Sequence, residues 1–228
     1  MTSLSTSTPS ASPSGDDGNR TLDVVTLVVL GATCAVTAAL YPRLPARIPI
    51  HFDVRGVADG WAGKGFGAWL MPLTMLGVVA FVRVGARFLA PSWRARTATS
   101  AASLLLLIVT IGMLAIHFLM LHVALTGVAS MGASLGVVLG ALWLALGLVM
   151  PRLRRNPWMG IRTPWTLSSD ENWARTHRVA GIAMSVAGLV AVLAVLAGSL
   201  ATAIVAVIAS GLGPLVYSFV IARKLDDR

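Results

Sequence analysis

Six long apolar runs alternate with short polar stretches along the chain. They cover roughly residues 22–41, 67–89, 100–122, 131–150, 179–199 and 201–222. Each run is close to the roughly 20 mostly apolar residues that an α-helix needs to cross a bilayer. The pattern therefore predicts an all-α integral membrane protein, a six-helix transmembrane bundle whose last two spans form a tight helical hairpin.

The composition agrees with a membrane protein rather than a soluble domain. Hydrophobic residues make up 56% of the chain and charged residues only 12%, whereas soluble domains carry about 25% charged residues. The net charge of +9 does not indicate direct nucleic-acid binding, because Lys and Arg lie in short clusters beside the apolar runs and no soluble domain is left over. The one cysteine, Cys34, excludes an intrachain disulfide.

The distribution of Lys and Arg predicts the orientation in the cell membrane. Fourteen of them lie in the tails, at the end of the second span and in segments 84–99 and 151–178, and four lie in the alternate loops. Because positively charged loops stay in the cytoplasm, we expect both termini inside. The predicted regions are a disordered Ser/Thr/Pro-rich cytoplasmic tail (1–21), the first two spans (22–95) with an outer loop (42–66), and a four-span region (96–228) with an inner loop (151–178).

The outer loop is expected to be a folded structure large enough to meet a ligand. Its prolines favour an extended chain, in which His51 and Asp53 project to the same side. Asp59-Gly60 is a turn signal, and this turn and Trp61 are expected to hold the loop compact. The candidate ligand-binding residues are His51, Asp53, Gly56, Asp59, Gly60, Trp61 and Lys64.

The inner loop carries three tryptophans within 16 residues, among arginines and hydroxyl side chains. Ser168 and Glu171 have the spacing of a capping box, which predicts a helix running into the fifth span. Trp173 and His177 share a face of that helix. An alternative interpretation is an interfacial segment with an aromatic belt, whose arginines bind lipid phosphates.

The runs 156–168 and 172–178 closely resemble the signature of the SdpI family, whose best-known member is the membrane immunity protein against a sporulation-delaying peptide toxin. The outer loop resembles the small uncharacterised domain that often precedes this signature. The resemblance implies a protein that protects the cell from a secreted peptide toxin, or senses it and signals to a cytoplasmic regulator. It implies these partner-binding candidates: Asn156, Trp158, Gly160, Arg162, Thr163, Pro164, Trp165, Asn172, Trp173, Thr176, His177 and Arg178.

Patterns for catalysis or cofactor binding are not recognised: the chain lacks GxSxG, HExxH and P-loop motifs. We therefore predict no enzyme activity and no cofactor, with a permease or lipid-modifying enzyme of unknown substrate as the alternative function. His117 and His122 lie near the outer end of the third span, on the side of His51 and Asp53. Because these histidines are five residues apart, their side chains diverge by about 140° on a helix. We therefore predict no metal site, with one formed by His51, Asp53 and one of these histidines as the alternative.

Three features of the spans bear on helix packing. Gly132, Gly136 and Gly140 repeat every four residues, which predicts close helix approach, more inside the bundle than in a dimer. In the sixth span two glycines precede Pro214, which should bend or break the helix. Arg83 and Arg87 (four apart at the end of the second span) are expected to snorkel to the interface.

Overall fold

The computed structural model describes residues 15–53, 55–88, 100–128, 130–157 and 159–226. Within these residues six helices are long and apolar enough to cross a membrane. This confirms the predicted all-α fold of a multi-pass membrane protein. The helices are α1 (Gly15–Leu40), α2 (Lys64–Phe88), α4 (Ser100–Thr126), α5 (Gly132–Val149), α7 (Asp170–Leu196) and α8 (Leu200–Asp226).

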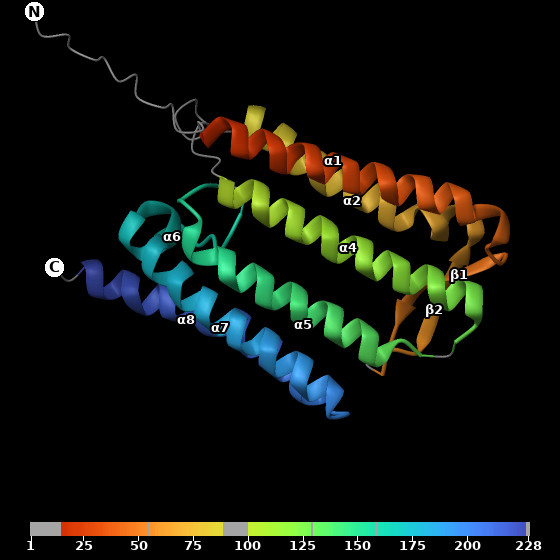
Figure 1. Ribbon diagram of the computed structural model, residues 1–228. Helices are drawn as coiled ribbons and strands as arrows, with labels where there is room; N and C mark the ends of the chain where they lie inside the picture. The colour runs from red at the N-terminus through yellow and green to blue at the C-terminus, as the bar shows by residue number, and fades with distance from the viewer. Residues whose placement is uncertain (1–14, 54, 89–99, 129, 158, 227–228) are drawn as a thin grey trace, which may run out of the picture.

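The helices lie side by side, so that their ends gather at the two ends of the bundle (Figure 1). α7 packs against both α5 and α8, and α4 packs against α1 and α5. The start of α1, the short helix α6 (Pro164–Ser168) and the end of α8 lie at one end, here called the α6 end. The antiparallel β-hairpin of β1 (Arg47–Phe52) and β2 (Ala58–Gly63) lies at the other, the hairpin end.

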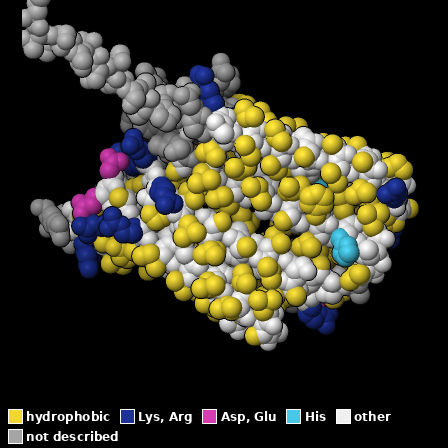
Figure 2. Space-filling view, in the orientation of Figure 1, with side chains coloured by type: hydrophobic (Ala, Val, Ile, Leu, Met, Phe, Trp, Pro, Cys, Tyr) yellow, Lys and Arg dark blue, Asp and Glu magenta, His cyan; other side chains and the backbone are white. Residues whose placement is uncertain are grey.

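The surface of the bundle has the polarity that a bilayer requires. Figure 2 shows hydrophobic side chains over the middle of the visible face and Lys and Arg side chains gathered toward its two ends. Large apolar side chains such as Phe81, Ile182 and Val205 are more than 60% exposed within the spans. Such exposure is unfavourable in water and favourable in lipid.

The first helix begins before the predicted end of the tail. α1 begins at Gly15, so residues 15–21 are helical, and the assignment of the whole stretch 1–21 to a disordered tail was wrong at its end. Residues 1–14 lie outside the described residues. Hydropathy marks only the part of a helix that lies in lipid, whereas backbone hydrogen bonds continue the helix beyond it.

The glycine face of α5 packs inside the bundle, as predicted. A Cβ on Gly136 would meet the Val195 side chain, and one on Gly140 would lie 3.0 Å from the carbonyl oxygen of Gly188. α5 and α7 therefore approach with little side-chain bulk between them. Gly132 is the exception in this row, because it faces the carbonyl oxygen of Arg55 in the hairpin.

The last two spans form the predicted tight hairpin. Its turn depends on Gly198 (φ 81°), whose N–H donates to the Val195 carbonyl at 3.0 Å. α8 then continues through Pro214 to Asp226 without a break. Proline lacks one hydrogen bond to the preceding turn, and that loss does not end a helix whose other backbone bonds are intact.

Arg83 does more than reach the interface. Its guanidinium forms an ion pair with Asp23 of α1 and a hydrogen bond to the Ser103 hydroxyl of α4 (3.4 Å). The pair thus joins three helices near the α6 end. The sequence offered a signal for it, because Asp23 lies just inside the first apolar run and a lone carboxylate at that depth needs a partner. The side chain of Arg87 lies outside the described residues.

Candidate functional site

The turn of the hairpin lies at residues 53–57 and not at Asp59-Gly60, which form part of β2. The Asp53 N–H donates to the Val57 carbonyl at 2.8 Å, and Gly56 has a φ of 74°. Gly60 is not among the glycines of positive φ. Its lack of a side chain is still needed, because a Cβ there would lie 2.7 Å from the Cβ of His51 on the paired strand.

Asp53 holds this turn. One carboxylate oxygen accepts hydrogen bonds from the backbone N–H groups of Arg55 (2.8 Å) and Val57 (2.9 Å), and the other accepts from the Arg55 guanidinium. The hydrogen bond from Val57 is the largest cause that holds the pKa of Asp53 below its ordinary value. Both carboxylate oxygens of Asp53 are therefore used to stabilise the turn. Asp53 also lies past the end of β1, so it does not continue the extended strand that contains His51.

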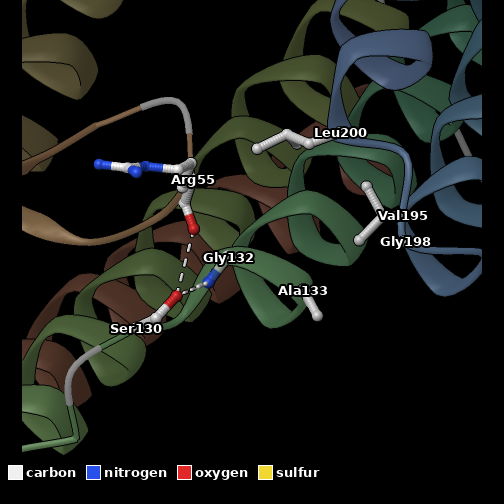
Figure 3. A pocket seen from close by; sticks show the side chains of 7 residues that line it. All are labelled: Arg55, Ser130, Gly132, Ala133, Val195, Gly198 and Leu200. Atoms are coloured by element: carbon white, nitrogen blue, oxygen red, sulfur yellow. Dashed lines mark hydrogen bonds between the residues drawn. The ribbon is translucent and has the colours of Figure 1, made fainter.

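The tip of the hairpin is docked onto the loop between α4 and α5 (Figure 3). The Ser130 hydroxyl donates to the Arg55 carbonyl at 3.2 Å and accepts from the Gly132 N–H at 3.2 Å, and the Met131 N–H donates to the Gly56 carbonyl at 3.1 Å. Gly56 is buried against Gly132, with no room for a Cβ on either residue. The hairpin thus closes over the start of α5.

The base of the hairpin is held by an aliphatic residue. Ile48 is fully buried between the hairpin, α2 and α4, in a cluster with Leu44, Ala68, Met120 and Leu121. Trp61, expected to hold the loop together, is instead 46% exposed. In a strand that packs on one face, every second side chain points outward. Trp61 is one of these outward-pointing residues of β2.

The exposed side of the hairpin carries a hydrogen-bonded His–Asp pair and an indole. His51 Nδ1 lies 2.6 Å from a carboxylate oxygen of Asp59, and both side chains are largely exposed. Asp59 and Trp61, two apart in β2, project from the same face. Lys64, at the start of α2, lies over the Tyr41 ring (4.8 Å) and donates to the Pro42 carbonyl. Of the outer candidates, His51, Asp59 and Trp61 have exposed side chains, and the first two are in contact.

The two histidines of the third span lie on different faces of α4, as the helix geometry predicts. His117 is fully buried, with Nε2 2.8 Å from the Thr37 hydroxyl, whereas His122 is exposed. The Thr37 hydroxyl donates to the Thr33 carbonyl, so it accepts the bond from His117 Nε2–H. Among the described residues, no three His, Cys, Asp or Glu side chains lie close enough to hold a metal ion.

The inner segment (residues 151–178) begins its helices with two hydroxyl caps. Thr163 caps α6 in a reciprocal capping box with Thr166, and Ser169 caps α7 by accepting the Asn172 N–H at 3.2 Å. The predicted box of Ser168 and Glu171 was therefore placed one residue too early. The reason is that Ser168 is the last residue of α6, where its hydroxyl donates to the Trp165 carbonyl.

Trp173 and His177 form the centre of the inner segment and share a helix face, as predicted. Their rings stack with centroids 4.0 Å apart. His177 Nδ1–H donates to the Trp173 carbonyl (2.9 Å), and Nε2 accepts the Ile161 N–H (3.1 Å). Gly160, at φ 100°, lets the chain pass close to the imidazole. Both ring nitrogens of a neutral imidazole are thus used to hold the loop.

Further bonds fasten the inner segment to α8. The Asn172 amide donates to the Ser218 carbonyl (3.0 Å) and accepts from the Thr176 hydroxyl (2.9 Å), while the Trp165 indole donates to the Ser218 hydroxyl (2.8 Å). The Trp173 indole donates to the carbonyl of Leu153 (2.8 Å). Sequence inspection missed Ser218, because nothing within the sixth span marks it as a partner of a loop some 50 residues earlier.

The partner-binding candidates therefore divide into buried and exposed sets. Thr163, Asn172, Trp173, Thr176 and His177 are buried, and Trp165 and Asn156 are half-buried. Gly160, Pro164, Arg162 and Arg178 are exposed. Trp158 lies outside the described residues. Of the exposed set, only the two arginines offer charge at the α6 end, where Figure 2 shows a concentration of basic side chains.

The hydrogen-bonded unit of inner segment, α7 and most of α8 corresponds to a known sequence family. Residues 152–218 match the model of the SdpI/YfhL protein family. This region of the chain is therefore similar to that family. Residues 28–76, which hold half of α1, the hairpin and half of α2, match a domain of unknown function, DUF1648. The predicted resemblance is confirmed in both parts.

The two matches leave residues 77–151 between them. That stretch contains α4 and α5, onto whose connecting loop the hairpin tip docks. The SdpI/YfhL match ends at Ser218, which accepts the bonds from Trp165 and Asn172. No curated protein and no solved structure matches the chain.

Proposed function

We propose that this protein is an SdpI-like membrane immunity or receptor protein, which protects the cell from a secreted peptide toxin or senses it and signals to a cytoplasmic partner. The observation that carries the proposal is the SdpI/YfhL match over residues 152–218. That region folds as one hydrogen-bonded unit, from the inner segment to Ser218. Membership of this family suggests an immunity-type function at the membrane, and no catalytic role is proposed for any residue.

The distribution of charge supports an orientation with the α6 end in the cytoplasm. Of the 18 Lys and Arg residues, 14 lie in the segments expected there and 4 in the loops of the hairpin end. Basic loops are retained inside. The inner segment and both chain ends then face the cytoplasm, and the hairpin faces the outside.

In this orientation the exposed face of the hairpin is the proposed contact for the secreted peptide. The His51–Asp59 pair offers charge and hydrogen bonds, and Trp61 offers a large apolar surface with a polar edge. Asp53, Gly56 and Gly60 keep the hairpin in shape and are not expected to touch the peptide.

On the cytoplasmic side, Arg162 and Arg178 are the proposed contacts for a protein partner. A guanidinium can form two parallel hydrogen bonds with a carboxylate, which a lysine ammonium cannot copy. One guanidinium nitrogen of Arg162 donates to the carbonyl of Pro157 at 2.7 Å, and the side chain is exposed.

The test is to delete the protein and expose the cells to peptides secreted by sibling and neighbouring strains. Cells without the protein should be more sensitive to at least one peptide, and the wild-type chain should restore resistance. His51→Ala and Trp61→Ala should reduce the rescue at normal membrane abundance. If the deletion changes neither sensitivity nor the transcriptional response to any secreted peptide, the proposal is wrong.

A further inference from the structure

An apolar groove of about 290 Å³ runs along the bundle between α5 and α8, with α7 at its floor. Leu139 and Trp143 line it from α5, Ala191 from α7, and Ala203, Ile204 and Ile208 from α8. Leu139, Ile204 and Ile208 are between 37% and 54% exposed. The groove is therefore open along its side, toward the surface that faces lipid.

The two ends of the groove differ. Toward the hairpin it meets a second cavity of about 290 Å³, which shares Leu200 with it and is lined by Arg55, Ser130 and Gly132 (Figure 3). Toward the α6 end, the Trp143 indole donates to the Ser210 hydroxyl at 2.8 Å and so joins α5 to α8. The groove thus opens toward Ser130 at one end and is bridged by this hydrogen bond near the other.

The length of the groove matches one leaflet of a bilayer. Its lining on α5 runs from Gly136 to Leu146, which is about 15 Å at 1.5 Å per residue. The hydrocarbon core of a bilayer is about 30 Å thick. A spanning peptide helix needs a surface through both leaflets, whereas an acyl chain extends through only one.

We propose that this groove binds one acyl chain of a phospholipid from the leaflet at the hairpin end, with the headgroup at the mouth beside Ser130. Filling the groove with an acyl chain provides van der Waals contacts that a void would lack. The site is separate from the hairpin face and the inner arginines, so it does not depend on the immunity proposal.

The residues at the mouth of the groove should discriminate little between phospholipids of different headgroup charge. In Figure 3 the Arg55 side chain points away from Val195 and Leu200, while its carbonyl points toward Ser130. Its guanidinium is paired with Asp53 at 3.0 Å. The site should therefore recognise the acyl chain, and phosphatidylcholine and phosphatidylglycerol should bind within about threefold of each other, because exposed ion pairs contribute little.

The first experiment counts phospholipid that stays with the full chain after purification in mild detergent, by native mass spectrometry. The wild type should retain one phospholipid per chain. Ala203→Leu places extra volume in the groove and should reduce retention at least tenfold. Ala201→Leu makes the same change at an exposed position on the same helix, and should retain the lipid as the wild type does.

Equal retention by Ala203→Leu and wild type, or no retained phospholipid in the wild type, would overturn the proposal. A retained peptide in place of a phospholipid would overturn it as well, since the groove would then have a different occupant.

A second measurement keeps the test valid if Ala203→Leu fails to fold. Phosphatidylcholine with brominated acyl chains quenches nearby tryptophans, and the difference between wild type and Trp143→Phe isolates the signal of Trp143. In detergent, a few equivalents of the lipid should quench Trp143, and Trp69, which packs in the cluster around Ile48, should stay bright. Quenching of Trp143 only in bulk lipid would contradict a specific site.

Discussion

The hairpin and the inner segment both contain His, Trp and Gly at loop positions, and they use these residues in opposite ways. In the hairpin, His51, Asp59 and Trp61 are exposed, and an aliphatic side chain, Ile48, provides the anchor. In the inner segment, Trp173 and His177 are buried and each is hydrogen bonded to backbone atoms.

This difference separates a region that exposes its polar and aromatic side chains from a region that uses them to hold the fold together. A buried polar group needs a partner, since an unsatisfied one costs about 1–3 kcal/mol. The inner segment meets that demand with a closed set of bonds among residues 153–177 and Ser218, so most of its distinctive residues are occupied. The hairpin instead leaves the His51, Asp59 and Trp61 side chains exposed, as a binding surface requires.

The largest effect is expected at Gly160. A Gly160→Ala side chain would meet the His177 imidazole at a φ of 100°. Backbone strain of about 1–3 kcal/mol adds to loss of the bond between Ile161 and His177, about 1–3 kcal/mol. Membrane abundance and the thermal unfolding temperature should both fall clearly.

Gly198→Ala is the matched control for that variant. Gly198 also has a positive φ (81°), but nothing lies within 4 Å of its missing Cβ. It should cost only the backbone strain, about 1–3 kcal/mol, without the added loss of a hydrogen bond. If the two variants are equally unstable, the inner segment is not built around His177.

A smaller effect, limited to one end of the molecule, is expected from Gly56→Ala. The new Cβ would collide with the Gly132 backbone, at a φ of 74°. We expect a loss of about 1–3 kcal/mol and faster hydrogen exchange at residues 55–57 and 130–132. Gly63→Ala, where nothing lies within 4 Å, should leave exchange unchanged. Equal exchange in Gly56→Ala and wild type would mean that the tip is not docked.

A still smaller effect depends on pH. The pKa of Asp53 is held below its ordinary value of 3.8 in the folded hairpin. The carboxylate therefore stabilises the fold above pH 3.8, and this contribution is lost as the pH falls through the folded pKa. Thermal unfolding should show Asp53→Asn less stable than wild type at neutral pH, with the gap narrowing in acid. A gap that widens in acid would show that Asp53 does not hold the turn as a carboxylate.

The smallest effect on stability is expected for Arg162→Lys. Arg162 is exposed, and surface substitutions usually change stability by less than about 0.5 kcal/mol. Membrane abundance should stay normal while the biological output is mostly lost. His177→Ala and Trp165→Ala should instead reduce abundance, because both side chains are bonded inside the fold. If output and abundance fall in step for Arg162→Lys, its role is structural.

Several features of this protein could be determined from the sequence alone, because they depend on local composition. Long apolar runs specify the spans, since any helix of that length and hydropathy is stable in lipid. The i, i+4 spacing of Trp173 and His177 predicts their shared face, and the spacing of Gly136 and Gly140 predicts close packing. Both predictions hold in the structure.

The tertiary structure decided what distant residues do to each other. The turn lies at Gly56 because the hairpin tip must fit against Gly132, some 76 residues later. Arg83 is paired because α2 lies beside α1 and Asp23. In the inner segment, the buried partner-binding candidates His177 and Asn172 are hydrogen bonded to Ile161 and Ser218, which the fold places beside them. Local sequence specifies which groups need partners, and only the packing of the helices decides which partners come within reach.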